Sequence, residues 1–122
     1  MDHAVRTKRV YDPEAAGDGT RILVDRLWPR GLTKAEVALD LWLKDVAPST
    51  ELRRWFAHRR DRWGDFSRRY VLELQSSAAV GRLRSLARAG SVTLLYAAKD
   101  RDRNEAVVLA AFLNGEACRA AD

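Results

Sequence analysis

Two short segments of this chain are rich in hydrophobic residues that favour β-strands, and both are followed by charged residues. Residues 22–24 read Ile-Leu-Val without a polar interruption, and residues 92–96 read Val-Thr-Leu-Leu-Tyr. Short, nearly continuous hydrophobic runs are typical of strands that are buried on both faces of a parallel sheet. We therefore predict that residues 22–25 and 92–96 form adjacent parallel strands in one sheet.

The long segment between these two strands shows helical periodicity and cap signals. Thr33 and Glu36 form a capping-box pattern, which predicts either a short helix or a surface turn. Ser49 is a good N-cap for a helix over residues 50–57, and aromatic residues spaced three and four apart predict a helix over residues 62–75. A further helix is predicted to end near residue 89. The last helix is predicted to open at residues 102–105; if Asp102 is its N-cap, Glu105 takes the capping-box position. These helices can serve as the crossover between parallel strands.

The first strand is predicted over residues 5–11, where β-forming residues alternate with basic ones. The loop that follows is too short for a helical crossover, so the first two strands could be antiparallel neighbours or non-adjacent strands. The predicted fold class is α/β, with a small, mostly parallel sheet of about three to four strands covered by helices. Residues 1–122 are expected to form a single domain, and residues 116–122 a flexible tail.

Composition excludes several classes of protein. The chain has 122 residues, 47% of them hydrophobic, and no hydrophobic run approaches the roughly 20 residues of a membrane span. The N-terminus lacks the hydrophobic core of a signal peptide, which predicts a cytoplasmic protein. The single cysteine, Cys118, cannot form an internal disulfide and has no partners for a zinc site. The sequence predicts no cofactor and no metal.

Charge points weakly towards an acidic partner. Twenty-two basic residues against 17 acidic ones give a net charge of +5, which would suit nucleic acid. The excess of arginine over lysine, together with abundant alanine, is also what a GC-rich genome produces without functional selection. The charge alone is therefore discounted.

Charged residues at the strand ends are the best candidates for a site, because ligands of open α/β sheets bind beyond the carboxyl ends of the strands. Arg26 and Arg30 follow the first buried strand, and Lys99 follows the second. With Asn104 and the start of the last helix, these residues predict a pocket for phosphate or carboxylate. Trp28 could stack on a ring of the ligand. The alternative is that the charges merely close the strand ends.

No catalytic motif accompanies this pocket. The sequence contains no phosphate-binding glycine loop and no nucleophile elbow. Asp25 could act as a base, as a metal ligand or as a counter-ion. His58 could act as a general acid or base, or be an ordinary hydrogen-bonded loop histidine. A magnesium site formed by Asp25, Asp100 and Asp102 is conceivable, but the surrounding arginines argue against it.

Several motifs resemble those of the YeaO-like proteins, a bacterial family of unknown function. They are RILVDRLWPRG at 21–31, WLKDVAPSTEL at 42–52, WFAH at 55–58, TLLYAAKD at 93–100, and the spaced residues Trp63, Phe66, Tyr70, Glu73, Leu74, Asn104, Ala106 and Val107. The resemblance covers about residues 8–113 and implies a compact α/β fold with no established activity. The family's recurrent polar residues fall on Asp25, Arg26, Arg30, His58, Lys99 and Asn104. Arg103 stands where many members carry histidine, which weakens any histidine-dependent mechanism there.

Three functions follow from these observations. The first is binding, with possible turnover, of a small anionic or phosphorylated ligand at the strand ends. The second is weak nucleic-acid binding by an arginine-rich helical surface, comprising Arg53, Arg54, Arg59, Arg60, Arg62, Arg68 and Arg69. The third is an interaction module with Trp28 and Trp42 in an interface. The sequence leaves the oligomeric state open.

Overall fold

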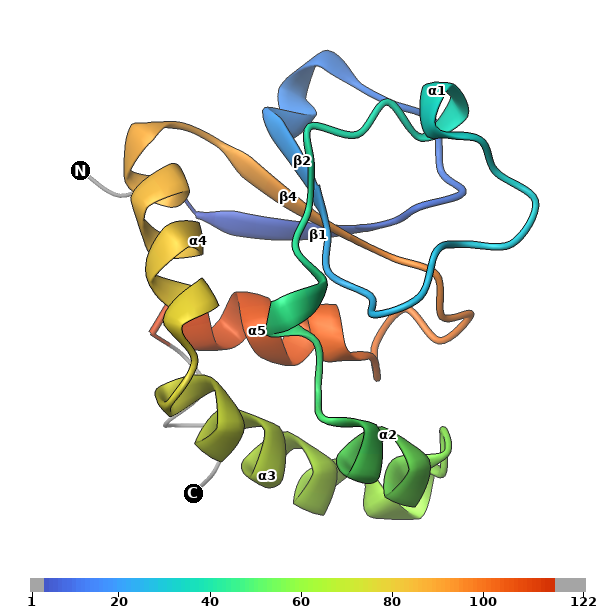
Figure 1. Cartoon of the computed structure of the whole chain (residues 1–122), viewed down its shortest axis with the longest axis vertical. Helices are drawn as coiled ribbons and strands as arrows, with labels where there is room; N and C mark the ends of the chain where they lie inside the picture. Colours follow the sequence, from blue (N-terminus) through green and yellow to red (C-terminus); the bar gives the residue numbers. More distant parts are fainter. Residues whose placement is uncertain (1–3, 116–122) are drawn as a thin grey trace.

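The computed structural model describes residues 4–115 and shows a four-stranded sheet with helices packed on it (Figure 1). The predicted tail at residues 116–122, including Cys118, lies outside the described residues. The strands are β1 (Val5–Arg9), β2 (Thr20–Leu23), β3 (Leu41–Trp42) and β4 (Val92–Tyr96). The helices are α1 (Lys34–Val37), α2 (Thr50–Phe56), α3 (Trp63–Gln75), α4 (Ala78–Ala89) and α5 (Glu105–Leu113).

All pairings in the sheet are parallel, in the order β1-β4-β2-β3. The predicted pairing of the two hydrophobic segments is confirmed, with Ile22 opposite Leu94 and Leu23 opposite Leu95. All of β4 is buried, as expected for a central strand covered on both faces. The predicted α/β class is therefore confirmed.

The first two strands are not antiparallel neighbours, because β4 lies between them and all three run in the same direction. The connection over residues 10–19 contains no α-helix, only a short 3₁₀ turn at Ala16–Asp18. Ten extended residues span about 33–36 Å, enough to return along the five-residue strand β1. Of the two arrangements left open by the sequence, the structure has the non-adjacent one, and an extended loop rather than a helix makes the crossover.

Alternating residues of the central strands divide the core into two layers, as the period of two along a strand requires. Ile22 and Leu94 face the larger layer, and α5 lies beneath that face of the sheet with α3 packed against it (Figure 1). Leu23 and Leu95 face a smaller layer that the loops around α1 cover. Only one face of the sheet therefore carries long helices.

Local signals account for most helix starts. Thr33 and Glu36 make the predicted capping box of α1, and the Ser49 hydroxyl accepts from the Leu52 amide at the start of α2. The start of α5 differs from the prediction: Asn104, not Asp102, is the N-cap, and its Oδ1 accepts from the Val107 amide over 3.0 Å. Glu105 is therefore the first residue of α5 and does not occupy the capping-box position.

Candidate functional site

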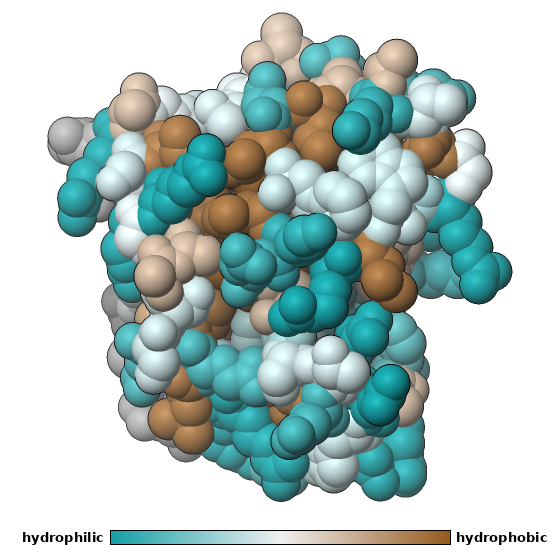
Figure 2. Space-filling model, in the orientation of Figure 1, coloured by the Kyte–Doolittle hydropathy of each residue, from teal (hydrophilic) through white to brown (hydrophobic). Residues whose placement is uncertain are grey.

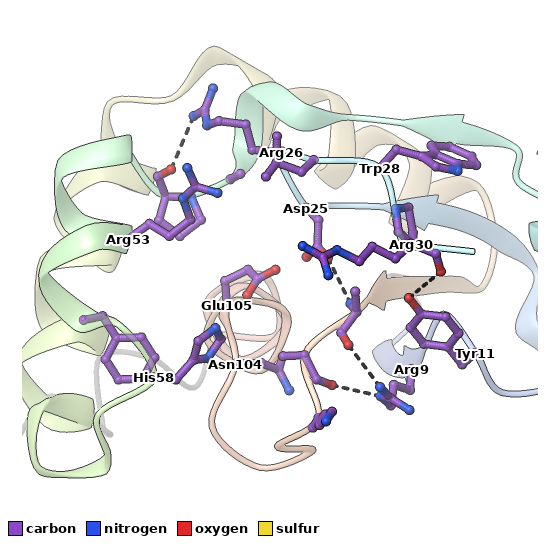
Figure 3. A pocket seen from close by; sticks show the side chains of 18 of the residues that line it. Arg9, Tyr11, Asp25, Arg26, Trp28, Arg30, Arg53, His58, Asn104 and Glu105 are labelled. Atoms are coloured by element: carbon purple, nitrogen blue, oxygen red, sulfur yellow. Dashed lines mark hydrogen bonds between the residues drawn. The ribbon is translucent and has the colours of Figure 1, made fainter. Parts of the chain in front are cut away.

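A cavity of about 690 Å³ opens at the carboxyl ends of the parallel strands (Figure 3). Its walls come from the residues that follow β1, β2 and β4, from α2 and the turn after it, and from the first turn of α5. Parallel strands end at the same edge of a sheet, so residues far apart in the sequence meet there. The topology by itself thus creates a site from separate segments.

The structure brings all seven sequence-predicted site residues to this cavity. The seven residues are Asp25, Arg26, Trp28, Arg30, His58, Lys99 and Asn104. Other lining residues come from β1, α2 and α3. Four more polar residues line the cavity that the sequence argument did not select, namely Arg9, Tyr11, Arg53 and Glu105.

Cations dominate the polar lining. Arg9, Arg26, Arg30, Arg53 and Lys99 approach from four separate segments of the chain. Within residues 4–115, none of the five forms an ion pair with a carboxylate. Guanidinium groups bind phosphate and carboxylate through paired hydrogen bonds, so this lining suits an anion.

Arg9 and Arg26 are positioned by backbone carbonyls rather than by acids. Arg9 donates from Nε to the Ala98 carbonyl over 3.0 Å, and its guanidinium lies 4.7 Å from the centre of the Tyr11 ring. Arg26 donates from Nη2 to the Pro48 carbonyl over 3.3 Å. Carbonyls carry no net charge, so both guanidinium groups keep their full positive charge at the cavity.

Asp25 joins the end of β2 to the end of β4. Its Oδ2 accepts from the Ala97 amide over 2.9 Å, and its backbone carbonyl accepts from the Trp42 indole over 2.7 Å. Its Oδ1 is buried and has no hydrogen-bond partner among the described residues. An unpaired buried acceptor is costly, which marks Asp25 Oδ1 as an atom that lacks a hydrogen-bond donor.

Glu105 provides a neighbouring acid. Burial raises the pKa of the Glu105 carboxyl well above its usual range, and the neighbouring Asp25 carboxyl raises it further. The Arg53 charge acts in the opposite direction but does not outweigh these causes. Two neighbouring carboxyl groups share one proton more readily than they both ionise.

His58 lies at the opposite wall of the cavity from Asp25 (Figure 3). Ala57 and His58 both adopt left-handed backbone conformations, with φ of 46° and 57°, which turn the chain after α2. The His58 ring is exposed and lies 6.0 Å from the Phe56 ring centre. No side chain within residues 4–115 hydrogen-bonds the His58 imidazole, so nothing described there orients it as a general base.

Trp28 and Asn104 line the cavity but use their polar groups elsewhere. The Trp28 indole donates to the Leu32 carbonyl over 2.7 Å, and its ring packs edge-on against Trp42 at 5.3 Å. This packing is within the chain, so the structure itself accounts for the tryptophan pair without an interface. Asn104 is buried and caps α5 while donating from Nδ2 to the Asp100 carbonyl.

The four missed residues lacked a signal that sequence alone could supply. Arg53 sits beside Arg54 on an exposed helix surface, and periodicity does not say which of the two faces a cavity. Arg9 ends β1 and Tyr11 follows it, and the sequence left the neighbour of this strand open. The sequence argument assigned Glu105 to helix capping and therefore did not consider it for the site that contains Asp25.

The conceivable magnesium site does not form. Asp100 uses its Oδ1 to accept from the backbone amides of Asp102 and Arg103, which closes the turn before α5. Within residues 4–115, no group of three histidine, cysteine or acidic side chains is placed to hold a metal ion. The same part of the chain contains no helix long and hydrophobic enough to cross a membrane.

Comparisons with known proteins agree with the resemblance seen in the sequence. Residues 4–122 match the family described as "Inactive DUF488-N3 subclade". An Escherichia coli (strain K12) protein named "Uncharacterized protein YeaO" is 47% identical over 110 residues, which cover 89% of this chain and 96% of that protein. An uncharacterised protein of Mycobacterium tuberculosis (strain ATCC 25618 / H37Rv) is 46% identical over 111 residues, covering 91% and 94%. No solved structure matches the chain.

Proposed function

The chain belongs to the inactive DUF488-N3 subclade, and from that premise we propose that it binds a small anionic or phosphorylated ligand in the cavity at the strand ends. The observation that supports this most directly is the set of five cationic side chains that reach one cavity without an ion-pair partner in residues 4–115. Uncompensated positive charge in a concave site attracts and concentrates anions.

Arg26, Arg30 and Lys99, joined by Arg53, hold the anion in this proposal. Trp28 and Asn104 shape the walls, since their own polar groups are engaged within the chain. The cavity has enough volume for a ligand of nucleotide or sugar-phosphate size, because small-molecule sites commonly enclose about 300–1,000 Å³. Cytoplasmic location, expected from the sequence, is part of the same proposal.

Binding is better supported than turnover. The family description carries the word "inactive". The two candidates for catalysis also lack the usual arrangement: His58 has no orienting partner among the described residues, and Asp25 already accepts from the Ala97 amide. We therefore assign Asp25 and His58 to the lining of a binding site rather than to a reaction.

Thermal unfolding in inorganic phosphate and pyrophosphate tests this proposal, with ionic strength held constant by a chloride salt. A ligand that binds only the folded state at 100 times its Kd stabilises that state by about 2.7 kcal/mol. Arg53→Ala should reduce this response, whereas Arg54→Ala should not. The two arginines are neighbours on α2 and both exposed, but only Arg53 lines the cavity.

Lys99→Ala and Lys34→Ala form a second matched pair, because both lysines are exposed and only Lys99 lines the cavity. If all four variants lose the same fraction of the response, the anion binds diffusely to a basic surface. If none of the tested anions raises the melting temperature of the wild type, the proposed function is wrong.

The nucleic-acid alternative receives less support. Figure 2 shows a hydrophilic surface over α2 and α3, where the arginine-rich residues lie. However, Arg59 pairs with Asp61 and Arg68 pairs with Asp65. Arg62 and Arg69 lie over the Trp55 ring, at 4.9 and 4.2 Å from its centre. Arginines held in this way offer fewer free contacts to a phosphate backbone.

A further inference from the structure

The proposed anion cavity also contains a negative site. Asp25, from the segment after β2, and Glu105, from the first turn of α5, meet in the cavity lining between cationic residues (Figure 3). A pocket for a simple anion would need no carboxyl groups, and acids beside it would weaken binding by repulsion. The pair therefore calls for an explanation beyond anion binding.

Hydrogen bonding around Asp25 indicates how many protons the pair carries. The Ala97 amide donates to Oδ2, and Oδ1 is buried without a donor from the described residues. Glu105 is the neighbouring side chain that can supply a proton, provided that its own carboxyl is neutral. Burial and the Asp25 charge both favour that neutral form of Glu105. A pair with one ionised and one neutral carboxyl carries a net charge of −1.

Arginines approach the acid pair from several segments of the chain. Arg26 follows Asp25 in the chain, Arg53 approaches from α2 with a charge that acts on Glu105, and Arg30 enters from the loop after β2. Burial is the main cause that raises the pKa of the Tyr70 phenol, on α3, so this group stays neutral. His58 lies on the far wall.

A second observation points to a two-ended ligand. In residues 4–115, only two buried side-chain polar atoms lack a partner, and both belong to residues that line this cavity. One is an acceptor, Asp25 Oδ1, and the other is a donor, Arg26 Nε. Buried unpaired groups are uncommon in folded proteins and often mark functional sites. Here, one belongs to the acid pair and the other to the arginine that follows it in the chain.

We infer that the cavity binds a ligand with an anionic group at one end and an amino group at the other, the amino group being held by the Asp25–Glu105 pair. This inference rests on the proposed function, since the arginines and Lys99 would hold the anionic end. The chemical class is that of amine-bearing phosphates. An ammonium group offers N–H donors and one positive charge, which together match a carboxyl pair of charge −1.

The competing explanation is that the pair is purely structural and ties α5 to the sheet. The two explanations predict opposite preferences. A cavity lined by five cations repels an ammonium group unless a specific acceptor holds it. If the pair is only structural, adding an amino group to a phosphate ligand therefore weakens binding.

Calorimetric titration with 2-aminoethyl phosphate and n-propyl phosphate distinguishes these explanations, because the two ligands differ mainly in an amino group and a methyl group. We expect the wild type to bind 2-aminoethyl phosphate about tenfold or more tightly, the gain typical of a hydrogen bond to a charged group. Glu105→Gln should preserve both affinities, because glutamine is neutral and can donate to Asp25 in the same way.

The double variant Asp25→Asn/Glu105→Gln removes the charge of the pair while keeping its shape. It should bind both ligands with similar affinity and still bind n-propyl phosphate. Glu51→Gln, an exposed acid on α2 outside the cavity, is the control and should behave as wild type. Its retained preference would show that a loss in the double variant comes from the cavity rather than from net charge.

Each failure has a separate meaning. A wild type that binds n-propyl phosphate but prefers it over 2-aminoethyl phosphate overturns this inference and leaves the proposed function standing. A preference for the amine that survives in the double variant also overturns it. If Glu105→Gln alone strengthens n-propyl phosphate binding about tenfold, Glu105 was ionised and the shared proton is wrong. If neither phosphate binds, the proposed function itself is wrong, and the inference fails with it.

Discussion

The two ends of strand β2 both carry arginines, yet their environments differ completely. Arg21, near the start of the strand, is 2% exposed. It pairs with Asp18 and donates to the carbonyls of Val37 and Ala38. Arg26, just beyond the end of the strand, pairs with no acid among the described residues and donates from Nη2 to the Pro48 carbonyl over 3.3 Å.

This difference separates charge that serves the fold from charge that is available to a ligand. A buried charge is tolerated only when it is paired and hydrogen-bonded, which is the case for Arg21. The arginines at the other end stay beside a cavity, where water or a ligand can solvate them. Arginine content alone therefore says little about function, whereas the partners of each arginine say a great deal.

The largest effect expected from this comparison is on stability at the start of β2. Arg21→Ala leaves the buried Asp18 without one of its two cationic partners, which should lower the free energy of unfolding by about 3–5 kcal/mol. Urea denaturation measures this loss. Arg53→Ala, at the exposed cavity wall, should stay within about 0.5 kcal/mol of wild type. Similar losses in both variants would remove the distinction between the two ends.

Acid unfolding gives the next largest effect. Burial alone raises the pKa of Asp18, but hydrogen bonds from Lys8, the Ala15 amide and Arg21 outweigh it and lower the pKa from 3.8 to about 2. A lowered folded-state pKa stabilises the protein above pH ~4, and this stability is lost as the pH falls from about 4 to about 2. It amounts to roughly 2 kcal/mol.

Asp18→Asn should therefore be less stable than wild type at pH 5, and the difference should shrink towards pH 2. Unfolding curves measured at several pH values would show this convergence. Asp61→Asn, which alters an exposed ion pair with Arg59, should run parallel to wild type over the same range. A constant gap between Asp18→Asn and wild type would contradict the assignment.

The loss of stability in Arg26→Ala should fall between the losses in Arg21→Ala and Arg53→Ala. The Arg26 side chain makes a hydrogen bond to Pro48 but no ion pair among the described residues. Arg26→Ala removes the hydrogen bond to the Pro48 carbonyl and should cost about 1 kcal/mol of unfolding free energy. Pyrophosphate should raise the melting temperature of this variant much less than that of the wild type. In Arg21→Ala, pyrophosphate should still raise the melting temperature, although the variant is less stable without ligand. Thermal unfolding with and without pyrophosphate measures both quantities in one series.

The smallest effect is expected on the exposed helix surface. Arg68 pairs with Asp65 three residues earlier on α3, and both side chains are more than half exposed. Exposed pairs of this kind contribute about 0–1 kcal/mol, so Arg68→Ala should change stability by less than about 0.5 kcal/mol. It should also leave the phosphate response unchanged. A response reduced as strongly as in Arg26→Ala would indicate diffuse binding to the whole basic surface.

Local patterns predicted those features that depend on neighbouring residues in the chain. The hydrophobic runs identified β2 and β4, and Ser49 identified the start of α2, because strand burial and helix capping act over a few residues. The cap of α5 was misplaced by two residues. Asp102 and Asn104 are both good N-caps, and residue type alone does not rank them. In the structure, Asn104 also donates to the Asp100 carbonyl.

The sequence by itself determined that charged residues end two adjacent buried strands, and this was enough to bring Asp25, Arg26 and Lys99 to one cavity. Only the tertiary structure decided that β4 separates β1 from β2, which brings Arg9 to the same edge. It also decided that Glu105 meets Asp25 across 80 positions of the chain. Such encounters depend on how helices and loops pack over the sheet, and that packing is a property of the whole core rather than of any local pattern.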